Sequence, residues 1–215
     1  MNKLLTSTLA GLSALTFASV ASAAPVVDGI TAVEVTVDLG PIEAGLIGDA
    51  SLADADGLVV NFPITGGDLD PDTLGGTIEH AGSGLSLLAN GTTVNLTDFV
   101  IDTVNSQLLS NVAVAGGADL GQVAIFDFSL DGLTPGQITD TDDPAISLLF
   151  TSAAAGALAD ALVIPALADL AGLEFGLAAT APVLGDVGSE IPLPGAAIFF
   201  VTGAAALAAR RRARA

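Results

Sequence analysis

The chain has 215 residues, of which 24 are Asp or Glu and only five are Lys or Arg; it holds one His and no Cys, Trp or Tyr. Disulfides, Cys-ligated metals and thiol chemistry are therefore excluded. A hydrophobic content of 51% argues against a disordered chain. The charges are segregated, because every carboxylate lies between Asp28 and Glu190 and every Lys or Arg lies outside that range. A body without cations cannot neutralise phosphates, so we expect no nucleic-acid partner.

The first 23 residues predict a secretory signal peptide with a short N-terminal signal helix. Lys3 supplies a positive charge, Leu9–Val20 supplies a short apolar run, and Ala21-Ser22-Ala23 matches the small-residue cleavage pattern. We therefore expect cleavage between Ala23 and Ala24. An N-terminal core helix is the alternative, but the apolar run ends where a cleavage site is expected.

Alternating β-branched and polar residues predict strands through most of the chain. Ile30–Leu39 has apolar residues at every second position, which is the pattern of a half-buried strand. Further predicted strands cover Gly57–Ile64, Thr77–His80, Leu85–Ala89, Thr92–Thr103, Gln107–Ala115 and Gln122–Leu130. Asn90-Gly91 lies between two of these strands and is the strongest hairpin signal in the chain.

A helical stretch interrupts the strands near the C-terminal end. Thr151 and Ser152 can cap a helix over Ala153–Ile164, and Pro165 ends it before a short helical turn. Leu173–Ala181 alternates again and predicts a last strand. The fold class predicted for residues 24–181 is therefore mainly β, a sandwich or partly open barrel with one or two short helices. Residues 182–190 are rich in Pro, Gly and Asp and predict a spacer.

Residues 191–215 predict a C-terminal transmembrane helix that is closed by an Arg cluster. The motif Ile191, Pro192, Leu193, Pro194 precedes an apolar run over residues 195–209, and Arg210, Arg211, Arg212 and Arg214 follow it. A helix from Ile191 to Ala209 would rise about 28 Å, close to the roughly 30 Å hydrocarbon core of a membrane. Arg residues stay on the cytoplasmic side, so the acidic domain would lie outside.

This order of Pro-containing motif, apolar helix and Arg cluster resembles the PEP-CTERM sorting signal in its VPLPA variant, with Ile191 in place of Val and Gly195 in place of Ala. The resemblance implies an exported protein of a Gram-negative bacterium, whose tail an exosortase-type enzyme recognises and processes at the inner membrane. It also implies a place at the cell surface or in the extracellular matrix, with exopolysaccharide as a partner. An ordinary single-pass anchor is the alternative.

Two acidic clusters are the best metal candidates. Asp68, Asp70, Asp72 and Glu79 have the spacing of positions 1, 3, 5 and 12 of a calcium-binding EF-hand loop, whose oxygen ligands suit Ca²⁺. Position six is Thr73 instead of Gly, and Pro71 lies within the loop, so a looser Ca²⁺ loop is the interpretation that we retain. The second cluster is Asp140, Asp142 and Asp143. For both clusters the alternative is a polar turn in which Asp side chains bond nearby backbone.

The stretch Gly75–Val112 resembles the haem-transport-associated β-domain of exported proteins, through a His followed by alternating strands and a hairpin. In that family a tyrosine ligates the haem iron, and this chain has no tyrosine. His80 is the only imidazole available as a ligand, and a hydrogen-bonded histidine at a strand end is the alternative.

No catalytic constellation can be singled out. The chain has one His and lacks the G-x-S-x-G and G-x-x-x-x-G-K-[ST] motifs, so we expect no enzyme. The function predicted is a non-catalytic surface or matrix protein without a required cofactor. A ligand-binding module, either a Ca²⁺-dependent adhesin or a haem-binding domain, is the alternative.

Overall fold

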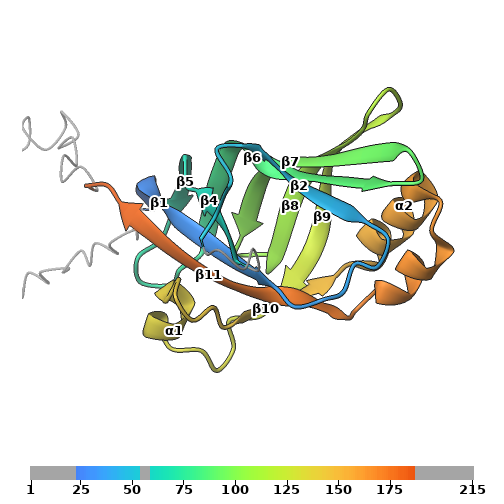
Figure 1. The fold of residues 1–215 in the computed structure, drawn as a ribbon. Helices are drawn as coiled ribbons and strands as arrows, with labels where there is room; N and C mark the ends of the chain where they lie inside the picture. The colour runs from blue at the N-terminus through green and yellow to red at the C-terminus, as the bar shows by residue number, and fades with distance from the viewer. Residues whose placement is uncertain (1–22, 54–58, 187–215) are drawn as a thin grey trace, which may run out of the picture.

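The computed structural model describes residues 23–53 and 59–186, and these form a mainly β domain (Figure 1). The strands are β1 (Ala24–Val35), β2 (Glu43–Gly48), β3 (Ser51–Leu52), β4 (Val59–Pro63), β5 (Gly66–Leu69), β6 (Gly76–Ala89), β7 (Thr92–Asp102), β8 (Gln107–Val114), β9 (Asp119–Phe128), β10 (Ile146–Phe150) and β11 (Glu174–Leu184). The helices are α1 (Pro135–Thr139), α2 (Ser152–Leu162) and the 3₁₀ helix η1 (Pro165–Leu170). The predicted mainly β class is confirmed.

The strands pair in a closed antiparallel circuit. From β5 the order runs through β6, β7, β8, β9, β10 and β11 to β1, and β1 returns to β5 through Ala24 and Pro25. The second half of β1 also pairs with β4, while β2 pairs with the second half of β6. A partly open barrel would leave a gap between its first and last strands. Here β1 pairs with β11, so the circuit is closed at that point.

The apolar core lies between two layers of this circuit. In Figure 1, β1, β10 and β11 cross the layer that β6 to β9 form, and α2 and η1 lie at the end of the domain away from α1. Phe126 stacks on Phe175 with ring centroids 4.7 Å apart, and Phe150 contacts both rings. Such aromatic pairs add to the free energy gained by burial alone. They join β9, β10 and β11, which follow one another in the chain and are neighbours in the sheet.

The two ends of the described domain lie side by side. Val26 of β1 pairs with Leu184 of β11, and the N–H of Gly185 donates a 2.8 Å hydrogen bond to the carbonyl oxygen of Pro25. The predicted spacer is therefore wrong at its start, because β11 continues through Pro182 to Leu184. Pro182 lacks an N–H but is tolerated there, since the carbonyl oxygen of its partner Gly29 accepts a hydrogen bond from Ile64 instead.

The hairpin predicted at Asn90-Gly91 is confirmed. Ala89 pairs with Thr92, and Asn90 and Gly91 have φ angles of 50° and 78°, as a type I′ turn requires. The Asn90 side chain also donates a 2.9 Å hydrogen bond from Nδ2 to the carbonyl oxygen of Leu162, at the end of α2. The turn thus fixes the C-terminus of a helix that lies far away in sequence.

Several predicted boundaries differ from the structure. The strands predicted over Thr77–His80 and Leu85–Ala89 are one strand, β6, with an irregularity between His80 and Gly84. β1 begins six residues before the predicted Ile30, and β5 lies where no strand is predicted. The strands β2 and β10 and the helix α1 were not predicted. The helix predicted after Thr151 is confirmed as α2.

Candidate functional site

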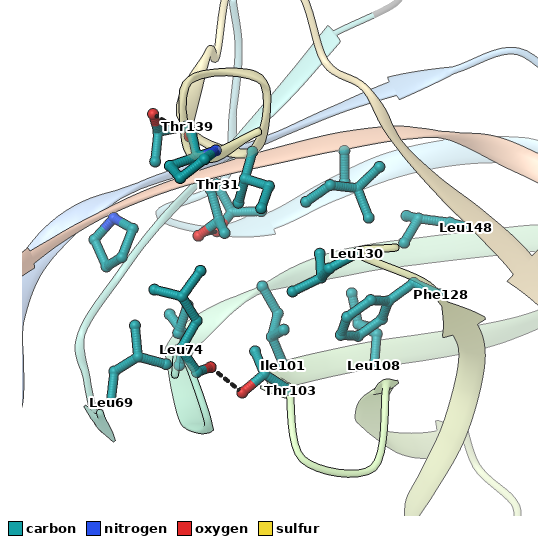
Figure 2. A pocket seen from close by; sticks show the side chains of 17 residues that line it. Thr31, Leu69, Leu74, Ile101, Thr103, Leu108, Phe128, Leu130, Thr139 and Leu148 are labelled. Atoms are coloured by element: carbon teal, nitrogen blue, oxygen red, sulfur yellow. Dashed lines mark hydrogen bonds between the residues drawn. The ribbon is translucent and has the colours of Figure 1, made fainter. Parts of the chain in front are cut away.

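A cavity of about 100 Å³ lies at the end of the core that α1 covers. Its wall is apolar, and the residues come from both layers and from three connecting segments (Figure 2). They are Thr31 of β1, Leu69, Leu74, Ile78, Ile101, Thr103, Leu108, Phe128, Leu130, Pro135, Ile138, Thr139, Ile146, Leu148, Ala178, Thr180 and Pro182. A concave apolar site of this kind is the usual starting hypothesis for ligand binding.

The cover of the cavity is the connection between β9 and β10, residues 129–145, which contains α1. Thr134 caps α1: its N–H donates to Oε1 of Gln137 at 3.1 Å, and its Oγ1 accepts from the N–H of Gln137 at 3.4 Å. Pro135 follows as the first helical residue, where its missing N–H costs nothing. Ile138 is the buried residue of α1, and it lines the cavity.

The four threonines of the wall use their hydroxyl groups within the protein. Thr103 Oγ1 donates to the carbonyl oxygen of Leu74 at 2.6 Å, a bond drawn in Figure 2. Thr139 Oγ1 donates to the carbonyl oxygen of Pro135 at 3.0 Å. The hydroxyl oxygens of Thr31 and Thr180 lie 2.9 Å apart. The cavity therefore presents methyl groups rather than free hydroxyls.

His80 does not line the cavity but contacts Thr31, which does, and its side chain is 1% exposed. Its Nδ1 is 3.2 Å from the carbonyl oxygen of Phe99, and its Nε2 is 2.8 Å from Oγ1 of Thr31. A carbonyl oxygen can only accept, so Nδ1 carries the proton and Nε2 of the neutral ring accepts from Thr31. Thr180 then donates to Thr31. Burial lowers the pKa of His80 to about 4, against the smaller opposing effect of the Phe99 carbonyl oxygen, so the ring is neutral at pH 7.

The hydrogen bonds of His80 match one of the two alternatives given for it. Both ring nitrogens are engaged and the side chain is buried, so the hydrogen-bonded histidine is confirmed. A metal ligand needs a free ring nitrogen. In this structure, His80 has none to offer to a haem iron.

The predicted calcium ligands are not gathered into one site. Asp68 lies in β5 opposite Thr77, and Glu79 lies in β6 opposite Gly66. Asp70 and Asp72 lie in the turn between these strands, where Oδ1 of Asp70 accepts the N–H groups of Asp72 and Thr73 at 2.8 and 3.1 Å. These hydrogen bonds hold the pKa of Asp70 below its ordinary value.

Across residues 23–53 and 59–186, no group of three or more His, Asp or Glu side chains is placed to hold a metal ion. The second acidic cluster follows the same pattern as the first, because Oδ1 of Asp140 accepts the N–H of Asp142 at 3.2 Å. The polar-turn alternative describes Asp70 and Asp140 in this structure. Calcium binding stays a prediction.

Most of the predicted processing residues lie outside the described residues. These are Ala21 at the cleavage site and Ile191, Pro192, Leu193, Pro194, Arg210, Arg211, Arg212 and Arg214 of the tail. Ala23 is exposed, and Ala24 is buried as the first residue of β1. In the described part of the chain, no helix combines the length and the apolar character that a membrane span needs.

The cavity was not predicted from the sequence, although part of its cover carries a signal. The run Thr134-Pro135-Gly136-Gln137 has the spacing of a capping box with Pro at the first helical position. That run predicts a helix start within a segment otherwise interpreted as a loop. The four threonines carry no comparable signal, because only the fold brings them together.

No protein-family model matches the chain, and no curated protein sequence matches it either. Among solved structures, the C-terminal domain of HtaA from Corynebacterium glutamicum is similar to this domain, with a TM-score of 0.51 and 15% sequence identity. The match covers 75% of this chain and 99% of that domain. The likeness agrees with the resemblance noted for Gly75–Val112, and at this identity it shows the fold alone.

The fold and the cavity define a mainly β domain with a closed strand circuit, an HtaA-like arrangement of strands and a covered apolar cavity.

Proposed function

We propose that the chain is an exported, non-catalytic protein of the cell surface or extracellular matrix of a Gram-negative bacterium, delivered through its C-terminal sorting tail. The observation that carries this proposal is the pairing of β1 with β11 next to both predicted processing segments. Because β1 begins at Ala24, cleavage after Ala23 would leave this strand complete. The tail would likewise follow a complete β11.

The side-by-side ends suit a domain that is processed twice. With the Gly185 N–H bonded to Pro25, the signal peptide and the tail would leave the domain at the same place. This arrangement would allow the folded domain to lie on one side of the inner membrane while the signal peptide and the tail are both inserted in the membrane. An exosortase-type enzyme would be the partner at this stage, and exopolysaccharide would be the partner after export.

Charge supports a hydrated surface role. Asp54, Asp56 and Glu190 lie outside the described residues, and the remaining 21 carboxylates have no Lys or Arg among residues 23–186 to pair with. Asp70 and Asp102 accept backbone N–H groups at turns, and Asp98 accepts the N–H of Gly82 at an irregularity within β7. A net charge far from zero keeps an exported, apolar-rich protein soluble.

The proposal is tested by the fate of the tail in cells. Replacing Pro192 and Pro194 together by Ala should block processing, so that the protein stays in the inner-membrane fraction with its Arg-terminated end. Pro71→Ala changes an exposed turn residue and serves as the matched control. If the double variant were exported and shortened like the control, the sorting role of the motif would be wrong.

A surface ligand-binding module is the second candidate, favoured by the apolar cavity and by the HtaA-like fold. The two ligands considered from the sequence are tested separately. For haem, the Soret band is recorded with the unmodified protein and with His80→Ala. We expect either no shift of the band or the same shift with both proteins. For a Ca²⁺-dependent adhesin, added Ca²⁺ should change the attachment of cells to a surface. Attachment that is the same with and without Ca²⁺ would exclude the adhesin.

A further inference from the structure

We propose that the cavity beneath α1 binds a small hydrocarbon group, of about the size of one aromatic ring, on a molecule that is neutral or cationic. The inference concerns a site and its ligand chemistry, and it does not depend on where the protein is located. It rests on three properties of the cavity: its volume, its dry wall and the charge around it.

The volume of the cavity sets the size of the ligand. About 100 Å³ is of the same order as the roughly 150 Å³ cavity, lined by Leu, Ile and Phe, that stays dry and binds benzene in another protein. Leu74, Ile101 and Phe128 give this wall the same chemistry. Sites for larger ligands usually measure about 300–1,000 Å³. One ring or a short alkyl group therefore fits, whereas a haem does not.

The wall offers no polar partner to a bound water. A buried water needs two to four hydrogen-bonding groups. The Thr103 and Thr139 hydroxyls already donate to carbonyl oxygens, and Thr31 and Thr180 bond to each other. A hydrocarbon would thus enter a dry space and gain contacts without displacing ordered water, at the low desolvation cost of an apolar group.

The surroundings select against anions. Three carboxylates flank lining residues in the chain: Asp70 follows Leu69, Asp102 follows Ile101, and Asp140 follows Thr139. Asp70 and Asp102 each accept backbone N–H groups in their turns, which favours their ionised forms, and Asp140 accepts the N–H of Asp142. No Lys or Arg lies between residues 23 and 186 to balance them. A ligand carboxylate would be repelled, and an ammonium group would not.

Three probes of equal ring size test the proposal on the purified full chain: toluene, benzylamine as its cation, and benzoate. Toluene and benzylamine should give intermolecular NOEs to the methyl groups of Leu74, Ile101 and Ile138. At saturation they should raise the melting temperature by about 2 °C or more, as a ligand of the native state does. Benzoate should do neither. NOEs confined to other methyl groups, or benzoate binding as tightly as toluene, would overturn the proposal.

Matched variants assign the effect to the cavity. Ala178→Val adds methyl groups to a lining residue of β11 and should remove the toluene NOEs and the thermal shift. Ala89→Val makes the same change at a buried alanine of β6 outside the cavity and should keep both. If Ala178→Val does not fold, Leu130→Ala provides the test, because it should admit p-xylene that the unmodified protein excludes. Toluene binding that survives in folded Ala178→Val, or p-xylene binding unchanged in Leu130→Ala, contradicts the assignment.

Discussion

Nε2 of His80 lies 2.8 Å from Oγ1 of Thr31, and through this contact a buried imidazole of β6 is linked to β1 and onward to Thr180 of β11. The three residues are far apart in sequence and come together where β1 and β11 close the strand circuit. Buried polar groups are costly unless they are bonded, and here each one has a partner. The chain of hydrogen bonds therefore fixes how the two layers of the domain meet.

The first prediction concerns acid stability. The folded-state pKa of His80 is about 4 and its ordinary value is 6.5, so the unfolded state binds more protons between these values. The stabilisation is fully present above pH 6.5 and is lost as the pH falls toward 4. By pH 5 the free energy of unfolding should drop by about 2 kcal/mol. Denaturant unfolding at pH 7 and pH 5 measures it. His80→Gln should remove most of this drop, and an equal drop in that variant would contradict the argument.

The second prediction concerns the hydroxyl of Thr31. Thr31→Val keeps the shape of the side chain but leaves His80 Nε2 and the Thr180 hydroxyl without their shared partner. Leaving buried polar atoms unbonded should lower the free energy of unfolding by about 1–3 kcal/mol. Thr36→Val, at an exposed position one residue beyond β1 where Oγ1 donates only a long 3.4 Å hydrogen bond to the carbonyl oxygen of Phe175, should change it by less than about 0.5 kcal/mol. Equal effects at the two positions would show that the hydrogen-bond chain does not stabilise the fold.

The third prediction concerns salt. The 21 described carboxylates repel one another, and no Lys or Arg within residues 23–186 offsets them. Raising NaCl from 10 to 500 mM shortens the Debye length from about 30 Å to a few ångströms. The melting temperature should therefore rise steadily over this range. Comparing millimolar Ca²⁺ with millimolar Mg²⁺ at the same ionic strength separates screening from binding at a calcium site. A melting temperature that does not change with salt concentration would contradict the repulsion between carboxylates.

The fourth prediction concerns the β6–β7 turn. Gly91 has a φ of 78°, which an Ala disfavours by about 1–2 kcal/mol, so Gly91→Ala should lower the free energy of unfolding by that amount. Gly136→Ala in α1 is the matched control, because Gly136 does not have a positive φ and an added Cβ meets nothing within 4 Å. The control should be neutral or slightly stabilising. Thermal unfolding of both variants provides the comparison, and equal losses would rule out the turn as the cause.

Local patterns predicted the elements that have strong local signals. The alternation in Thr92–Thr103, the Asn90-Gly91 turn and the Thr151 cap each depend on residues close together in sequence. β2 could not be recognised, because Glu43–Gly48 is exposed along most of its length and does not alternate clearly. β6 was divided in two because Gly82 and Gly84 interrupt its pattern, although pairing with β7 carries the strand across them.

The candidate site was the least predictable part of the molecule. The sequence marked His80 as the only histidine, but its partners Thr31 and Phe99 are 49 and 19 residues away. The calcium spacing of Asp68 to Glu79 assumed a loop, whereas these residues span two paired strands and their turn. In both cases strand register, which depends on pairing across the whole sheet, decides which side chains meet.

Export with processing at both ends is tested by the intact mass of the protein recovered from outside the cells. We expect a chain that begins at Ala24, the buried first residue of β1, and that has lost its Arg-terminated end. A protein found in the cytosol with Met1 and Ala215 both present would contradict it.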